Sequence, residues 1–336
     1  MFIGKKLVTS LLAIGSVTMS MSCAADSDIK IRSIFDIKKL FCAVKANDVL
    51  SMDNRFSSLE GNGLLTSSSN SMLVLENGIN EITLEVGALD WFSNKSLKEK
   101  QKSMYSTDAY CNVALTLFSG DKQQVITKIN VTIDNDGHPQ ANTDESGQDP
   151  LSIKNTMAWQ VEQGHIHDDY FIENLYPQGM TLHRFTQKVY LKGLPEWRWT
   201  KATPFTSKPE EILALQNAYN ELWRLFVAKD NNAIKNKMHI SLNAWSIATD
   251  ANIDRLYNSY DFVDGFKNKT FKMIPINWKD YTVEITNKGR LVRFVNKSDP
   301  TISPLSYDVT AEDGEIELRS FSPYLSIVDG RVTPVI

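Results

Sequence analysis

The sequence lacks several features that would assign a function directly. Only three of its 336 residues are cysteines and five are histidines, and its 36 lysines and arginines do not outnumber its 40 acidic residues. Without a surplus of positive charge the chain has no electrostatic reason to seek nucleic acid or anionic lipid. It also contains no Gly-x-Ser-x-Gly elbow and no glycine-rich phosphate loop. We therefore expect neither a nucleic-acid binder nor an enzyme, and no cofactor.

Long apolar runs are also missing, apart from one near the start. Lys5 and Lys6 precede LVTSLLAIGSVTM, and the small residues of SMSCAADS follow. A positive start, roughly a dozen apolar residues and a small-residue cleavage site are typical of a secretory signal, and the run is too short to span a bilayer comfortably. The sequence thus predicts a signal peptide at residues 1–25 and a secreted mature protein. Removing the two lysines takes the net charge from -4 to -6.

The three cysteines leave two questions open. Cys23 lies at the expected cleavage site, but the preceding Ser20, Met21 and Ser22 match a lipoprotein signal poorly. A lipoprotein anchored through Cys23 remains an alternative, and it is the only form in which we expect membrane association. Cys42 and Cys111 form an even pair, which in an oxidising compartment predicts a disulfide. Two buried free thiols are the alternative.

The first part of the mature chain has the alternation of β-strands. Apolar and polar residues alternate on both sides of Asn77-Gly78, which predicts a hairpin, and again in CNVALTLFSG and QQVITKINVTIDNDG. Several short strands at regular spacing favour a β-sandwich, here over residues 26–145. The polar, aperiodic stretch at 138–150 is the best linker candidate.

Residues 151–336 predict a second domain with helices followed by strands. Ser207 and Glu210 form a capping box, and apolar residues then recur at helical spacing to about Phe226. Further helices are expected over about 231–248 and 251–259. From Phe271 the apolar period changes to two. Helices followed by an antiparallel sheet indicate that the fold class is α+β.

The order of these elements resembles the cone-shaped fold of nuclear transport factor 2. The resemblance covers roughly residues 207–336 and rests on the helices, the Asp329-Gly330 turn and the closing strand YLSIVDGRVTPVI. That fold hosts enzymes, ligand binders and interaction modules, so it settles no function. It does imply a pocket, which Tyr281, Glu284 or Arg293 could line. A periplasmic small-ligand-binding protein or hydrolase is therefore the alternative function.

The stretch GHIHDDYF, residues 164–171, is the strongest candidate for a metal centre. His165, His167 and Asp169 follow the ligand run of metallo-β-lactamase-like hydrolases, but Tyr170 stands where the last histidine should be. In that family the motif follows a buried apolar strand, whereas WQVEQG precedes it here.

A catalytic zinc needs three protein ligands held by a rigid frame. Among the histidines outside this stretch, only His183 could plausibly supply the third. We therefore interpret GHIHDDYF as a solvated loop in which Asp168 or Asp169 caps a short helix. A functional metal remains the weaker alternative.

Tryptophans are the most informative residues for binding. In an extended segment Trp197 and Trp199 share one face, with Arg198 opposite. They either pack in the core or form an exposed patch, and Trp and Arg are enriched in binding hot spots. Trp91 has the same ambiguity. These four residues are the candidate partner-binding residues.

Most of the mature chain also resembles bacterial periplasmic immunity proteins encoded beside type VI secretion effectors. The stretches that carry the resemblance are FCAVKANDVLSMDNRF, LVLENGINEITLEVGALDWFS, LPEWRWTKATPF, KGRLVRFVNKS and TPVI. The resemblance implies an inhibitor that binds a cognate protein toxin, often a lipase, before the toxin attacks the envelope. Such a function rests on protein–protein interaction and needs no catalysis, in agreement with the missing motifs.

Overall fold

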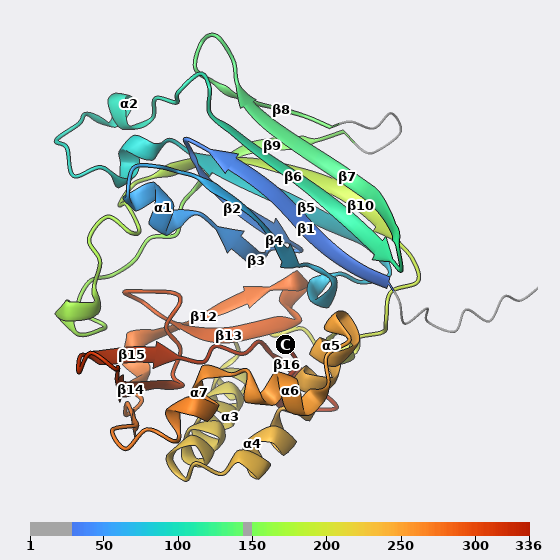
Figure 1. The fold of residues 1–336 in the computed structure, drawn as a ribbon, viewed down its shortest axis with the longest axis vertical. Coiled ribbons are helices and arrows are strands. Elements are labelled where there is room, and N and C mark those ends of the chain that lie inside the picture. Colours follow the sequence, from blue (N-terminus) through green and yellow to red (C-terminus); the bar gives the residue numbers. More distant parts are fainter. Residues whose placement is uncertain (1–28, 144–149) are drawn as a thin grey trace, which may run out of the picture.

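The protein folds into a β-sandwich joined to a smaller part made of helices and two antiparallel sheets, so the fold class is α+β as predicted (Figure 1). The computed structural model describes residues 29–143 and 150–336. The expected signal peptide at 1–25, with Cys23, lies outside the described residues, as does part of the expected linker. Within the described residues, no helix is long and apolar enough to cross a membrane.

Two five-stranded antiparallel sheets form the sandwich. The first sheet has the order β4 (Leu65–Asn70), β1 (Ile29–Lys38), β6 (Tyr110–Ser119), β7 (Lys122–Ile133) and β8 (Pro139–Asn142). The second has the order β3 (Val49–Asp53), β2 (Phe41–Ala46), β5 (Gly78–Gly87), β10 (Thr181–Leu191) and β9 (Ser152–Met157). Alternate residues of these strands point inward, so that Ile82, Leu84 and Val86 of β5 are buried.

The sandwich does not end at residue 145, as the sequence suggested. Strand β10 pairs with β5 from His183 to Leu191, and β9 then pairs with β10. The expected boundary between domains 26–145 and 151–336 is therefore wrong, because the second sheet is completed only at Leu191. The local pattern revealed β10 as a strand, but its partner lies about a hundred residues earlier in the chain.

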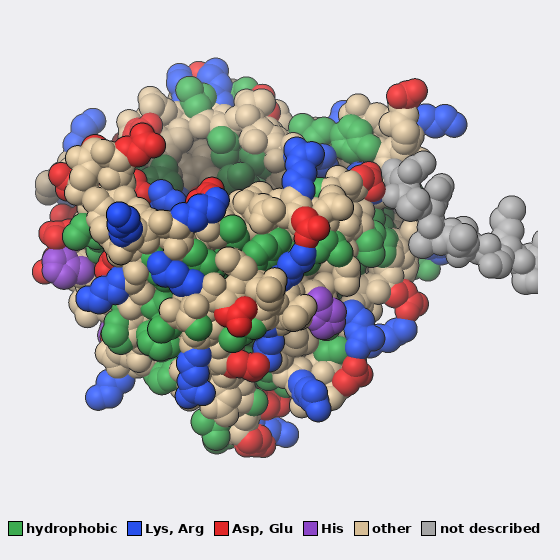
Figure 2. Space-filling view, turned by 60° about the horizontal axis from the view of Figure 1, so that its bottom comes forward, with side chains coloured by type: hydrophobic (Ala, Val, Ile, Leu, Met, Phe, Trp, Pro, Cys, Tyr) green, Lys and Arg blue, Asp and Glu red, His purple; other side chains and the backbone are tan. Residues whose placement is uncertain are grey.

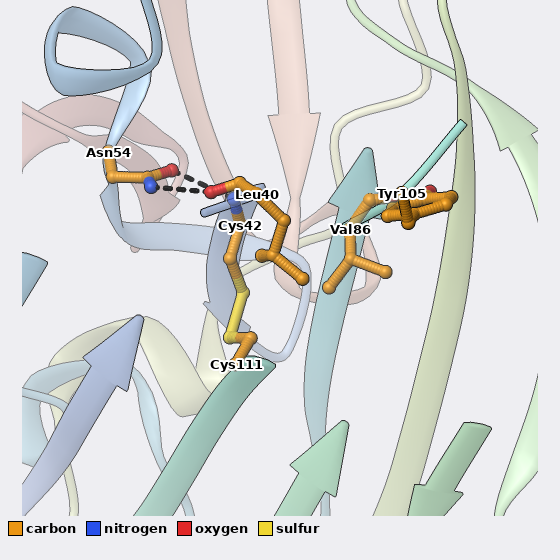
Figure 3. Close-up of a disulfide and its surroundings, with 6 residues drawn as sticks. All are labelled: Leu40, Cys42, Asn54, Val86, Tyr105 and Cys111. Carbon is orange, nitrogen blue, oxygen red and sulfur yellow. Dashed lines mark hydrogen bonds between the residues drawn. A yellow bond between two sulfur atoms is a disulfide. The ribbon is translucent and has the colours of Figure 1, made fainter. Parts of the chain in front are cut away.

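A disulfide between Cys42 and Cys111 joins β2 to β6 across the sandwich and confirms the predicted pair (Figure 3). Both cysteines are fully buried. Asn54 braces this point of β2: its Oδ1 accepts a hydrogen bond from the Cys42 amide, and its Nδ2 donates to the Leu40 carbonyl, each at 2.8 Å. The cross-link therefore lies in a fixed, apolar part of the core.

The hairpin expected at Asn77-Gly78 is wrong. The residues before it form a 3-10 turn, η1 (Met72–Val74), and only β5 follows as a strand. The Asn77 side chain explains the difference, because its Nδ2 donates to the Leu194 carbonyl at 2.8 Å and its Oδ1 accepts from the Leu194 amide at 2.9 Å. Asn77 thus binds a distant segment instead of closing a local turn.

The helices begin close to the predicted position. Helix α3 (Pro209–Val227) buries Leu215, Tyr219, Leu222 and Phe226, which confirms the predicted apolar face. The remaining helices are α1 (Arg55–Leu59) and α2 (Glu99–Lys102) beside the sandwich, and α4 (Asn231–Lys237), α5 (His239–Thr249), α6 (Ile253–Asn258) and α7 (Asp261–Gly265) after α3.

Two details of the helices differ from expectation. The helix expected at 231–248 is broken at the buried Met238, which ends α4 and begins α5. The capping box does not involve Ser207 and Glu210. Glu211 accepts instead from the backbone amides of Thr206 and Lys208, because Ser207 takes a left-handed conformation with φ 61° and shifts the helix start by one residue.

The last part of the chain forms two small sheets rather than one. One has the order β11 (Lys272–Met273), β14 (Ser306–Thr310) and β15 (Ile316–Ser320). The other has the order β12 (Tyr281–Thr286), β13 (Leu291–Asn296), β16 (Leu325–Val328) and β17 (Arg331–Pro334). The resemblance of residues 207–336 to the cone-shaped fold stays a prediction.

Candidate functional site

The segment GHIHDDYF forms one wall of a groove of about 960 Å³. The three-stranded sheet β11-β14-β15 contributes much of the rest, and residues around the start of β12 and the end of β13 complete the lining. The lining residues are His165, Ile166, His167, Asp169, Tyr170, Lys272, Met273, Ile274, Pro275, Asn277, Asp280, Tyr281, Asn296, Ile302, Ser306, Asp308, Gly314, Glu315, Ile316 and Leu318.

Hydrogen bonds to the backbone of this wall fix it to the end of β13 and to the residues just after it. The His165 amide donates to Ser298 Oγ at 2.9 Å, and Asn296 Nδ2 donates to the His165 carbonyl at 2.8 Å. Ser298 Oγ in turn donates to the Glu162 carbonyl at 2.6 Å. Asn296 and Ser298 are buried, so the start of the segment is tied to the fold. His167, Asp168 and Asp169 are exposed, as expected of the solvated loop that the sequence predicted.

The His165 ring is held by two carboxylates. Its Nδ1 lies 3.0 Å from Asp280 Oδ1, and its Nε2 lies 3.2 Å from Glu162 Oε2. The neighbouring pair behaves differently, since His167 and Asp169 are both exposed and lie 3.2 Å apart at the rim. The predicted candidates therefore do not converge: His165 points toward Asp280, while His167 and Asp169 pair with each other.

The metal hypothesis gains no support from this geometry. Within residues 29–143 and 150–336, no three His, Cys, Asp or Glu side chains are placed to hold one ion. His183 lies in β10 beside the Tyr105 ring, with 5.9 Å between ring centroids, where burial lowers its pKa. The expected helix cap is also different, because the 3-10 turn η3 (Asp168–Tyr170) is capped by His167, whose Nδ1 accepts from the Asp169 amide.

The three-stranded sheet presents opposite faces to the helices and to the groove. Tyr307 and Val309 of β14 pack into the helical cluster, while Asp308 between them lines the groove. Asp308 is paired in register with Lys272 of β11 and Leu318 of β15. The face of the sheet that lines the groove therefore combines apolar side chains with a carboxylate.

Negative charge dominates the groove. Its lining includes the carboxylates of Asp169, Asp280, Asp308 and Glu315, and Lys272 is its only lysine or arginine. The pKa of the Tyr170 phenol is raised, first by burial and then by the charges of Asp308 and Asp169. Carboxylates on both sides of the groove therefore contribute to the raised pKa of Tyr170. Elsewhere the charges are mixed, and Figure 2 shows acidic and basic side chains interspersed over one face.

The segment around Trp197 and Trp199 belongs to the core and not to an exposed binding patch. Trp199 is 1% exposed and Trp197 4%. The Trp197 indole N–H donates to the carbonyls of Met72 and Leu75 at 3.1 and 3.0 Å, and that of Trp199 donates to Leu73 at 3.0 Å.

Of the four candidate partner-binding residues, only Arg198 is exposed; it lies in a 3-10 turn, η4 (Arg198–Lys201), and pairs with Asp329 at 2.6 Å. Trp91 is also buried, in a cluster with Phe41 and Phe92. The three tryptophans are therefore corrected to core residues, because their rings and indole donors are used within the fold.

The polar residues expected in a C-terminal pocket bind mainly one another. Arg293 donates to Glu284, the Tyr324 hydroxyl lies 3.3 Å from the same Glu284 oxygen, and the Arg293 guanidinium lies 4.5 Å from the centroid of the Tyr324 ring. Only Tyr281 of the three expected residues reaches the groove, and its hydroxyl donates to the Ser303 carbonyl at 3.3 Å.

Sequence reasoning missed Asp280, Asp308 and Glu315. Asp280 lies just before β12, Asp308 in β14 and Glu315 in the turn before β15, so no single motif connects all three. The one signal was an acidic residue inside the apolar strand SYDVT. No family model, no curated protein and no solved structure matches this chain.

Proposed function

We propose that the chain is a periplasmic immunity protein that binds and neutralises a secreted antibacterial toxin, such as a type VI effector with phospholipase activity. The observation that carries the proposal is the acidic groove between residues 164–171 and the sheet β11-β14-β15. The groove is a surface suited to a protein partner, and it supports the same function as the family resemblance of the sequence.

The walls of the groove are held in place by the rest of the fold, which supports binding to a protein. Ser298 and Asn296 hold the 164–171 wall through its backbone, and the opposite wall is a sheet whose other face packs on helices. A partner would therefore meet a surface that is already in place, which lowers the entropic cost of association.

The disulfide supports the proposed location in the periplasm. A buried cross-link between Cys42 and Cys111 suits an oxidising environment such as the periplasm, where such bonds form and persist. It also limits local opening of the sandwich, which is useful to a protein that must survive outside the cytoplasm.

The alternative, a small-ligand-binding protein or hydrolase, is favoured by one observation. The groove volume of about 960 Å³ falls within the range of small-molecule sites. Native mass spectrometry separates the two functions, because a ligand binder would carry or take up a small molecule, whereas an immunity protein would form a complex with the toxin.

Protection in living cells tests the main proposal. Toxins encoded next to the gene are directed to the periplasm of a sensitive host, with or without the full chain, and surviving colonies are counted. We expect one toxin to become harmless with the full chain, and to remain lethal with a chain that lacks residues 1–25 and stays in the cytoplasm. Failure of the full chain to protect against every such toxin would remove the proposal.

A further inference from the structure

We infer that the groove binds a segment of a protein partner that carries lysine or arginine beside apolar side chains. The inference rests on the proposed function only in taking the toxin as the owner of that segment. It commits to the chemistry of the occupant, which charge and exposure in the groove define.

Charge complementarity is the first argument. Asp308 and Glu315 line the groove, and neither makes an ion pair with any other residue that the structure describes. Asp280 and Asp169 add negative charge from the opposite side; each pairs with a histidine, and Asp280 Oδ2 also accepts a hydrogen bond from Asn277 Nδ2 at 2.8 Å. A cationic side chain entering between the walls would therefore meet carboxylates on both sides.

The apolar part of the lining is the second argument. Ile316 is 62% exposed, although it stands on β15 directly beside the groove, and Ile274, Pro275 and Leu318 also line it. A purely ionic ligand would leave these side chains in water. Lysine and arginine pair a long apolar stem with a charged end, so a segment containing them can cover Ile316 and reach Asp308 together.

A second copy of this chain could supply a competing occupant. The stretch SNKSLKEKQK, residues 93–102, is rich in lysine and lies on and before α2, outside the groove of its own molecule. A second copy could in principle present it. Self-association is therefore measured alongside binding, because a dimer that depends on Asp308 and Glu315 would assign the groove to a second copy and overturn the inference.

Selection of peptides tests the chemistry directly. A phage-displayed library of random twelve-residue peptides is selected on the full chain purified from the periplasm, and each round is depleted on the Asp308→Lys/Glu315→Lys variant. We expect enriched peptides to contain several lysines or arginines beside apolar residues. They should bind wild type at least about tenfold more tightly than the variant, with a difference that shrinks in high salt.

Two further variants serve as controls for this selection. Asp121→Lys/Asp136→Lys makes the same change of net charge at exposed turns of the sandwich and should bind like wild type. Asp308→Asn/Glu315→Gln removes the charges with little change of shape, and it should weaken binding even if the lysine variant folds poorly. Uncharged or acidic peptides, no enriched peptides, or equal binding to all variants would overturn the inference.

The outcomes are separable from those of the proposed function. If no toxin is neutralised but basic peptides still bind at Asp308 and Glu315, the immunity function fails and the groove assignment stands. If the Asp308→Asn/Glu315→Gln variant protects cells as well as wild type and no basic peptide is selected, the groove assignment fails and the immunity function stands.

Discussion

Arg290 holds Glu76 in a two-pronged hydrogen bond that joins segments 214 residues apart. Its Nη1 and Nη2 donate to Glu76 Oε2 and Oε1, both at 2.7 Å, and the two side chains are only 12% and 13% exposed. The same guanidinium lies 5.1 Å from the Trp199 ring centroid and donates to the Thr200 carbonyl at 3.1 Å. This pair couples the sandwich to the C-terminal sheets.

Replacing this carboxylate should weaken the whole protein. We expect Glu76→Gln to lower the free energy of unfolding by about 2 kcal/mol at pH 7, because Arg290 loses its charged partner in a largely buried place. Burial raises the pKa of Glu76, but the hydrogen bonds from Arg290 and Lys288 outweigh it and hold the pKa below its ordinary value of 4.5. Urea unfolding followed by circular dichroism measures the effect.

The pH dependence of this difference has a defined sign. A carboxyl whose pKa is lowered by folding stabilises the protein above its unfolded pKa, and loses that contribution as pH falls through the folded pKa. The gap between wild type and Glu76→Gln should therefore close below about pH 4.5. Glu196→Gln is the control, since Glu196 pairs with Lys201 on the exposed surface, and it should change stability little. Equal losses in both variants would contradict the role given to Glu76.

The disulfide should account for a large share of the stability. Cys42 and Cys111 are 69 residues apart, and closing a loop of that size contributes about 4 kcal/mol in the chain-entropy model. We expect the Cys42→Ala/Cys111→Ala variant to unfold at correspondingly lower urea concentration.

A thiol count provides the independent check on this bond. Because both cysteines are fully buried, unreduced native protein should show no reactive thiol, and a mild reductant should act only once urea opens the sandwich. Two titratable thiols in unreduced, denatured protein would show that the bond does not form.

Variants of Trp199 and Arg198 should show which of the two residues serves packing and which serves binding. Trp199→Phe removes the indole donor that satisfies the Leu73 carbonyl, so we expect a loss of about 1–3 kcal/mol in the free energy of unfolding. Arg198→Ala removes only an exposed pair with Asp329 and should leave stability nearly unchanged. If Arg198→Ala is stable but no longer protects cells, Arg198 regains its place as a partner-binding residue.

The features that followed from the sequence are those set by local pattern or by pairing rules. The apolar face of α3 was readable because residues such as Leu215 and Leu222 repeat at helical spacing. The pair Cys42 and Cys111 was readable because two cysteines remain after the expected signal peptide. Both depend on information contained within one segment or one residue type.

The features that did not follow depend on contacts between distant segments. Asn77 looked like a hairpin residue because its partner, Leu194, is invisible in the local sequence. The groove was hidden for the same reason: Asp280 and Asp308 become neighbours of the 164–171 segment only after two sheets form. Trp197 remained ambiguous because its acceptors are backbone carbonyls, which no side-chain pattern reveals.

His165 supplies the last test, which concerns metal binding. Both of its ring nitrogens lie within hydrogen-bonding distance of a carboxylate, so a zinc ion would have to displace Glu162 or Asp280 and recruit ligands that are not converging here. Protein purified without chelator should therefore carry less than about a tenth of an equivalent of zinc by elemental analysis, and added zinc should not shift its Tm. His165→Ala should instead loosen residues 164–171, seen as faster hydrogen exchange there. Stoichiometric zinc that disappears in both His165→Ala and Asp169→Ala would restore the metal centre and reopen the hydrolase alternative.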